Sequence, residues 1–132
     1  MKKLFIFILF VFNIVAINAQ ILTFRTTGYY ERQKYDWGWG NWSSKQASNM
    51  NIIINLNINV VTIYSPKTQI YSIYKYLGTK KDSDGDITMT YKFYDQDLDF
   101  GNMRLMIRKN GQSQIYIDFS NISWAYDVIR TN

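Results

Sequence analysis

The chain has 132 residues, of which 47% are hydrophobic, 17% aromatic and 19% charged, and it carries a formal net charge of +5. This composition excludes a disordered or low-complexity chain and predicts a folded protein. Cysteine and histidine are absent, which excludes disulfides, Cys/His zinc sites, the usual haem and iron–sulfur ligation, thiol nucleophiles and histidine bases. We therefore expect no cofactor.

Residues 1–19 have the pattern of a secretory signal peptide. Two lysines precede an apolar run from Leu4 to Val15, and Ala19 supplies a small residue before a cleavage site. An uncleaved anchor is disfavoured, because Asn13 interrupts a run already shorter than the roughly 20 residues that span a bilayer. We expect an exported, periplasmic or extracellular mature chain, residues 20–132, without a membrane span. Losing the two lysines leaves 13 basic and 10 acidic residues, a net charge of +3.

The mature chain shows no linker or internal repeat, so we predict one domain. Apolar and polar residues alternate along it, which is the period of half-buried strands, and no window shows a sustained helical period. The expected strands are 22–33, 51–56, 60–64, 69–77, 87–94, 103–108, 115–119 and 123–129. Residues typical of turns separate them. We interpret Asn57-Ile58-Asn59 as a turn, since one strand over 51–64 would be unusually long.

The best-defined local feature is a hairpin around Asn110-Gly111. Both residues accept positive φ, so the pair predicts a two-residue type I′ turn. The alternation in the two flanking strands predicts which side chains face the core. These are Met103, Leu105, Ile107, Ile115, Ile117 and Phe119.

Eight short strands with short connections predict an all-β antiparallel meander that forms a small closed or nearly closed barrel. Closure removes sheet edges that an aromatic-rich sheet leaves exposed to aggregation. Two packed sheets forming a sandwich are the alternative. An eight-stranded barrel is just wide enough to be filled by side chains or to hold one small ligand. Candidates for the interior are Phe24, Tyr64, Phe93, Phe119 and Trp124.

The order of several short motifs resembles short exported proteins of Bacteroidetes-type bacteria that have no assigned function. These motifs are Thr26-Thr27-Gly28, Trp39 and Trp42, Ile63-Tyr64-Ser65, Thr68-Gln69-Ile70-Tyr71, Asp84-Gly85-Asp86 and Ile115-Tyr116-Ile117-Asp118-Phe119. They span most of the mature chain but consist of turns and strand patterns. The resemblance implies a bacterial envelope location and supplies no active site.

The segment from Tyr35 to Trp42 is rich in tryptophan. It contains Trp37, Trp39 and Trp42, and Tyr29 and Tyr30 lie just upstream. Exposed aromatic rings bind sugar rings or a partner's apolar surface with large contact area at small entropic cost, so these five residues are our candidate ligand-binding set. The alternative is a long loop whose tryptophans fold back to plug one barrel end, because large exposed apolar patches are uncommon.

Asp82, Asp84 and Asp86 match the first half of a calcium-binding loop. The second half fails, because Ile87 stands where the loop needs glycine and Phe93 where it needs a bidentate glutamate. A second alternation of acids, from Asp95 to Asp99, lacks the same two features. We interpret both as solvated turns and predict no metal site, with the first three aspartates as weak calcium candidates.

Lys92, Arg104 and Arg108 occupy outward positions on neighbouring predicted strands, and Lys75 extends this basic stripe. Such a stripe can contact anionic polysaccharide or lipid headgroups. The alternative is a solvated barrel face on which positive charges limit aggregation. The small net charge and the lack of a recognition helix argue against nucleic acid.

The mature chain has one glutamate, Glu31, and nine aspartates, with no motif typical of catalysis around them. A pair of acid and base residues would have to be assembled across the fold, so we predict that the protein is not an enzyme. We expect a monomeric exported binding module that holds a glycan or an apolar ligand. The alternative is an envelope protein that binds or inhibits another protein, with its tryptophans serving the core.

Overall fold

The computed structural model describes residues 20–132, and the predicted signal peptide, 1–19, lies outside the described residues. The described chain is all-β. Its strands are β1 (Ile21–Tyr35), β2 (Gly38–Trp39), β3 (Gln46–Ala47), β4 (Asn51–Asn55), β5 (Val60–Tyr64), β6 (Gln69–Lys81), β7 (Ile87–Tyr94), β8 (Phe100–Ile107), β9 (Ser113–Asp118) and β10 (Ile122–Arg130). Within residues 20–132 no helix has the length and hydrophobicity needed to cross a membrane.

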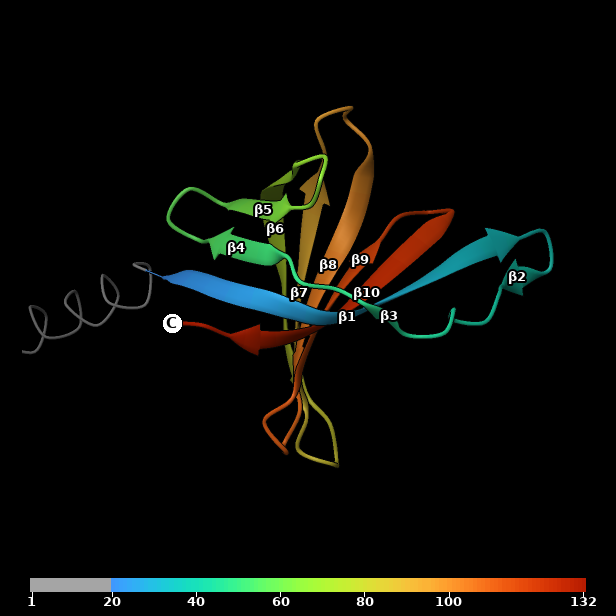
Figure 1. The fold of residues 1–132 in the computed structure, drawn as a ribbon. Coiled ribbons are helices and arrows are strands. Elements are labelled where there is room, and N and C mark those ends of the chain that lie inside the picture. The colour runs from blue at the N-terminus through green and yellow to red at the C-terminus, as the bar shows by residue number, and fades with distance from the viewer. Residues whose placement is uncertain (1–19) are drawn as a thin grey trace, which may run out of the picture.

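Eight of these strands close into an antiparallel barrel (Figure 1). From β4 to β10 each strand pairs with the next along the chain, β4 pairs with β1, and β10 pairs back with β1 to complete the circle. The short strands β2 and β3 also pair with β1. The barrel prediction is therefore confirmed over the sandwich, and the eight predicted strands correspond to the barrel strands.

Side chains fill the barrel, as the alternation predicts. The Phe93 ring is fully buried at the centre. Branched and unbranched apolar side chains surround it, namely Ile52, Ile54, Val61, Ile63, Met103, Leu105, Ile115 and Ile117. Two predictions are wrong: Tyr64 is 50% exposed and Ile107 is 38% exposed. Each lies at the last position of its strand, and Tyr64 follows the buried Ile63, which places it on the outer face.

The hairpin prediction is confirmed for its position but wrong for its turn type. The Gly111 amide donates to the Arg108 carbonyl at 2.9 Å, and the Arg108 amide donates to the Gln112 carbonyl at 2.9 Å. Gly111 has a φ of 88°, whereas Asn110 is absent from the residues with positive φ. The connection is thus a three-residue loop with one left-handed residue. The Asn110 side chain instead caps the turn by accepting the Gln112 amide at 3.0 Å.

β1 and β6 are longer than predicted, and irregularities in both change which side chains face inward. In β1 the pairing with β10 shifts between Thr26 and Gly28, so the face that each following residue presents is reversed.

Beyond the barrel, the end of β1 and β2 form a two-stranded arm, residues 33–40 (Figure 1). The predicted turn between β4 and β5 is confirmed, and Asn59 within it has a φ of 56°.

Candidate functional site

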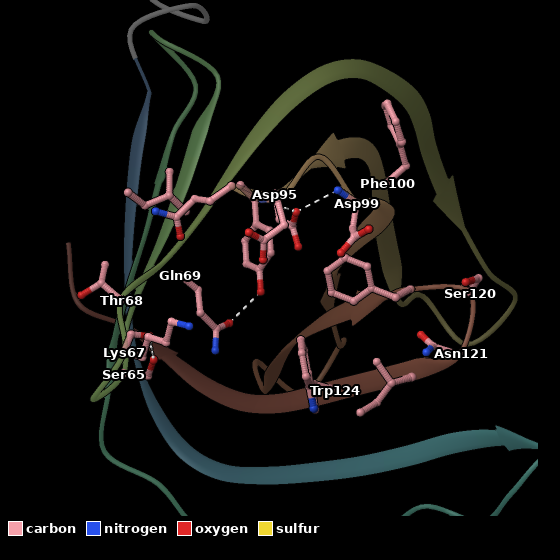
Figure 2. Close-up of a pocket in the computed structure, with 16 residues that line it drawn as sticks. Ser65, Lys67, Thr68, Gln69, Asp95, Asp99, Phe100, Ser120, Asn121 and Trp124 are labelled. Carbon is pink, nitrogen blue, oxygen red and sulfur yellow. Dashed lines mark hydrogen bonds between the residues drawn. The ribbon is translucent and has the colours of Figure 1, made fainter.

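One end of the barrel is hollowed. Three connections surround this end, namely residues 65–68, 95–99 and 119–121. Between them lies a cavity of about 580 Å³, which Figure 2 shows. Tyr71, Phe119 and Trp124 supply aromatic lining, and polar side chains surround them, including Lys67, Gln69, Asp95, Ser120 and Asn121. We call this cavity the mouth. It combines flat apolar surface with hydrogen-bonding groups.

A second hollow of about 380 Å³ adjoins the mouth. Tyr29, Glu31, Met50 and Tyr126 are among its lining residues. The two hollows share three residues, which are Ser65, Gln69 and Trp124. The two hollows adjoin at these residues, and together we call them the trough.

Trp124 stands where the two hollows meet. β10 positions it, and its indole nitrogen donates to Glu31 Oε1 at 3.0 Å. Its ring meets the Phe119 ring edge-on, with centroids 5.7 Å apart. Phe119 in turn packs edge-on against the buried Phe93 at 5.4 Å. The trough's central ring is therefore held by the core on one side and by a carboxylate on the other.

Tyr71 and Gln69, which line the mouth together with Trp124, are hydrogen-bonded to each other. The Tyr71 hydroxyl donates to Gln69 Oε1 at 2.6 Å, as Figure 2 shows. Burial raises the pKa of Tyr71 well above its ordinary value, and Tyr126 and Asp95 raise it further. The phenol therefore stays protonated at neutral pH. Because the Gln69 oxygen accepts this bond, its amide nitrogen remains available as a donor to a ligand.

Three carboxylates gather on the rim of the mouth. Oxygens of Asp95, Asp97 and Asp99 lie within 4.8 Å of one another, which is close enough for them to share a cation. Asp95 Oδ1 already accepts the amides of Asp97 and Asp99 at 2.9 Å each. The three aspartates thus belong to the β7–β8 turn, which Asp95 caps.

The first acidic segment lies at the opposite end of the barrel. Asp82 Oδ1 accepts the amides of Asp84 at 2.9 Å and Asp86 at 3.0 Å. Asp86 accepts the Lys109 amide at 3.0 Å and pairs with Arg108 at 3.7 Å. Figure 1 shows the β6–β7 and β8–β9 turns side by side at this end. Asp86 therefore joins two hairpins, and within residues 20–132 only the three rim aspartates form a close group of carboxylates.

The tryptophan-rich segment is divided between two environments. The Arg32 guanidinium lies 4.6 Å from the centroids of both Trp39 and Trp42. Trp42 also meets Tyr116 of β9 edge-on at 6.1 Å. Trp42 therefore covers part of the outer wall of the barrel, and Trp39, in the arm, contacts the same Arg32. Neither alternative from the sequence placed a tryptophan on the outer wall. Trp37 alone is mostly exposed, at 74%.

The five predicted binding residues do not form one surface. The shift in β1 places Tyr29 in the trough, where its ring lies 5.7 Å from that of Tyr126. Tyr30 lies on the outer wall and donates to Asp127 Oδ2 at 3.2 Å. Trp37 stacks on Tyr35 at 5.4 Å in the arm. The sequence pattern does not show the pairing shift in β1, so it could not show that Tyr29 and Tyr30 lie on opposite faces of the barrel wall.

The predicted basic stripe is also divided. Arg104 pairs with Asp118 at 2.7 Å, and its guanidinium lies 4.2 Å from the Tyr116 ring centroid. Arg108 donates to Gln114 Oε1 at 2.8 Å. Lys92 is in register with Lys75 across β6 and β7, and neither forms an ion pair within the described part of the chain. Only the lysine half of the stripe is free to bind an anion.

The sequence analysis proposed Trp124 for the core and did not identify Gln69, Tyr71 or Glu31 as site residues. One signal could have found the mouth, because alternate turns of a meander lie at the same end. The sequence predicts turns at 65–67, 99–102 and 120–121, and grouping them predicts this end, although the second connection is in fact 95–99 because residues 100–102 belong to β8. Comparisons with models of protein families, with curated proteins and with solved structures find no match to the chain. The resemblance to exported bacterial proteins therefore stays a prediction.

Proposed function

We propose that the protein is an exported, non-enzymatic binding module that holds a glycan in the trough. The observation that carries this proposal is Trp124, a half-buried ring at the junction of two adjoining hollows. Flat rings cover the C–H faces of sugars with large contact area and little loss of side-chain entropy. Two adjoining hollows with a ring between them suit a ligand of several linked sugar units.

The polar lining favours a glycan over a purely apolar ligand. Gln69, Glu31 and Asn121 offer donors and acceptors around the rings. A sugar satisfies such groups through its hydroxyls, whereas an apolar ligand would leave them buried without partners, at a cost of about 1 to 3 kcal/mol each.

The test is calorimetric titration of the full chain with a panel of neutral oligosaccharides. We expect at least one to bind, and Trp124→Leu and Gln69→Ala to weaken it by about tenfold, as expected when a ring contact or a well-placed hydrogen bond is lost. Trp37→Ala is the matched control, because Trp37 lies in the arm, and its affinity should equal that of the wild type. Thermal melting of each variant separates loss of binding from loss of folding.

Two outcomes contradict the trough as the site. One is that no neutral oligosaccharide binds the wild-type chain. The other is that Trp37→Ala abolishes binding while Trp124→Leu preserves it, which would transfer the site to the arm.

A protein partner is the second candidate, and the tip of the arm favours it. Tyr35 is 52% exposed and Trp37 is 74% exposed, and their rings stack nearly parallel at 12°. Such a flat aromatic pair, projecting beyond the barrel, suits the apolar surface of another envelope protein. Pull-down from envelope extract tests this: Trp37→Ser should lose a specific partner that Trp124→Leu retains.

A further inference from the structure

Three aromatic rings form a cluster on the outer wall where β6, β7 and β8 meet. The centroids of Tyr74 and Tyr94 are 6.1 Å apart, and the Phe100 ring lies 5.9 Å from Tyr74 and 6.2 Å from Tyr94. Despite these contacts, Tyr74 is 51% exposed and Phe100 is 65% exposed. We call these three residues the aromatic cluster. It offers apolar ring faces to solvent on the outer wall.

Two lysines adjoin the aromatic cluster in an unfavourable arrangement. Lys75 and Lys92 are directly opposite each other on neighbouring strands. Like charges at such positions destabilise a sheet. Within residues 20–132 neither lysine has a carboxylate within ion-pair distance. An anion lying between the two ammonium groups would remove this repulsion.

A groove of about 300 Å³ lies beside these residues. Tyr74, Phe100 and Lys92 line it together with polar groups, which include Asn102 and Ser120. The acid in its lining, Asp118, is neutralised by Arg104, with Nε and Oδ2 2.7 Å apart. Among the described residues that line the groove, Lys92 therefore carries the one charge without a partner, and aromatic and hydrogen-bonding groups lie beside it. Lys75 does not line the groove but is in register with Lys92 on the neighbouring strand.

We propose that this groove binds an acidic sugar unit of an anionic polysaccharide. The sugar ring lies against the aromatic cluster, and its carboxylate lies between Lys75 and Lys92. Charge complementarity selects an anion, and the recess with its polar lining selects a sugar over a flat lipid surface. The groove adjoins the mouth, with which it shares Phe100, Phe119 and Ser120, but Trp124, Gln69 and Glu31 do not line it.

The test is calorimetric titration of the full chain with oligogalacturonate, with a neutral malto-oligosaccharide of equal length as control. We expect the acidic oligomer alone to bind in the groove, and its affinity to fall as salt is raised. The double variant Lys75→Gln/Lys92→Gln should weaken binding by about tenfold, as expected for the loss of charge-assisted hydrogen bonds. Phe100→Ser should weaken it similarly. Lys80→Gln removes an exposed lysine from the same strand and should leave it unchanged.

Each alternative outcome overturns the proposal. If Lys80→Gln weakens binding as much as the double variant, the attraction is one of bulk charge. If oligogalacturonate fails to bind while phosphatidylglycerol vesicles bind through Lys75 and Lys92, the surface is one for lipid. Trp124→Leu is expected to retain uronate binding, so failure of the groove and failure of the trough are distinguishable.

Discussion

The outer wall of the barrel differs between its two sides. On the covered side, formed by β1, β9 and β10, both aspartates are paired: Asp127 of β10 with Lys45 at 3.1 Å and Asp118 of β9 with Arg104 at 2.7 Å. Trp42 lies over this side, and the outward-facing Ala125 beneath it is only 4% exposed. On the open side, formed by β6, β7 and the start of β8, Lys75 and Lys92 have no acidic partner among residues 20–132, and aromatic rings face solvent.

The comparison shows that composition alone does not explain the exposed rings. Both sides carry aromatic and basic side chains, and only the covered side uses them internally, by stacking Arg32 between Trp39 and Trp42. On the covered side the guanidinium and the rings therefore contact one another, although Arg32 Nε has no hydrogen-bond partner among residues 20–132. On the open side Lys75 and Lys92 have no ion-pair partner in the described part of the chain and ring faces are exposed, which is how a contact surface is expected to look.

The largest expected effect comes from removing the cover. Trp42→Ala takes away a ring that contacts Arg32 and Tyr116. We expect the free energy of unfolding to fall by about 2 to 3 kcal/mol, below the loss for a fully buried tryptophan because this ring is half-buried. Trp37→Ala, at the exposed tip of the arm, should change it by less than about 0.5 kcal/mol. If urea denaturation gave equal losses of stability for the two variants, Trp42 would not be what stabilises the covered side.

Asp127 tests the polar part of the covered side. Partial burial opposes its ionisation, but hydrogen bonds from Gln114, Lys45 and Tyr30 outweigh this and hold its pKa below the ordinary 3.8. The ionised carboxylate therefore stabilises the folded state at pH values above the ordinary pKa of 3.8. This stabilisation is lost as the pH falls through the lowered pKa. Asp127→Asn should cost about 1 to 2 kcal/mol at neutral pH.

The same variant should lose less stability than the wild type between pH 5 and pH 2 in urea titrations, since the linked proton uptake is gone. Asp36→Asn, in the arm, is the matched control. A wild-type acid dependence that persists unchanged in Asp127→Asn would assign that dependence to other carboxylates.

The barrel itself could be predicted because alternation and turn residues are local signals. The side chains that form the trough could not be grouped in the same way, because Trp124 and Glu31 are joined through the closure of the barrel between β10 and β1. The division of Tyr29 from Tyr30 depends on a one-residue shift in pairing, which no periodicity marks. Sequence also cannot distinguish a tryptophan that lies on the outer wall from one that fills a barrel end.

The third prediction concerns the β7–β8 turn at the edge of the open side. Leu98 has a φ of 63°, whereas glycines take the corresponding position in two other turns, at Gly85 and Gly111. Leucine is strained in this region, and its side chain is 69% exposed, so little packing repays the strain. Leu98→Gly should raise the free energy of unfolding by about 0.5 to 1 kcal/mol. A loss of stability would show that the leucine side chain makes a contact that outweighs the strain.

The smallest expected effect gives the sharpest test of the open side. Lys75→Glu places a carboxylate directly opposite Lys92, which converts a repulsive cross-strand pair into an attractive one. The free energy of unfolding should rise by about 0.2 to 1 kcal/mol, and the gain should shrink at high salt because both groups are near solvent. Lys80→Glu is the control, since Lys80 faces Thr88 and gains no such partner. Lys75→Glu could stabilise the fold and yet abolish binding of oligogalacturonate. In that case the native lysine lowers the stability of the fold, and its role in binding explains why it is present. A destabilising Lys75→Glu would show instead that the lysine pair is already compensated within the fold, and the contrast between the two sides of the wall would no longer hold.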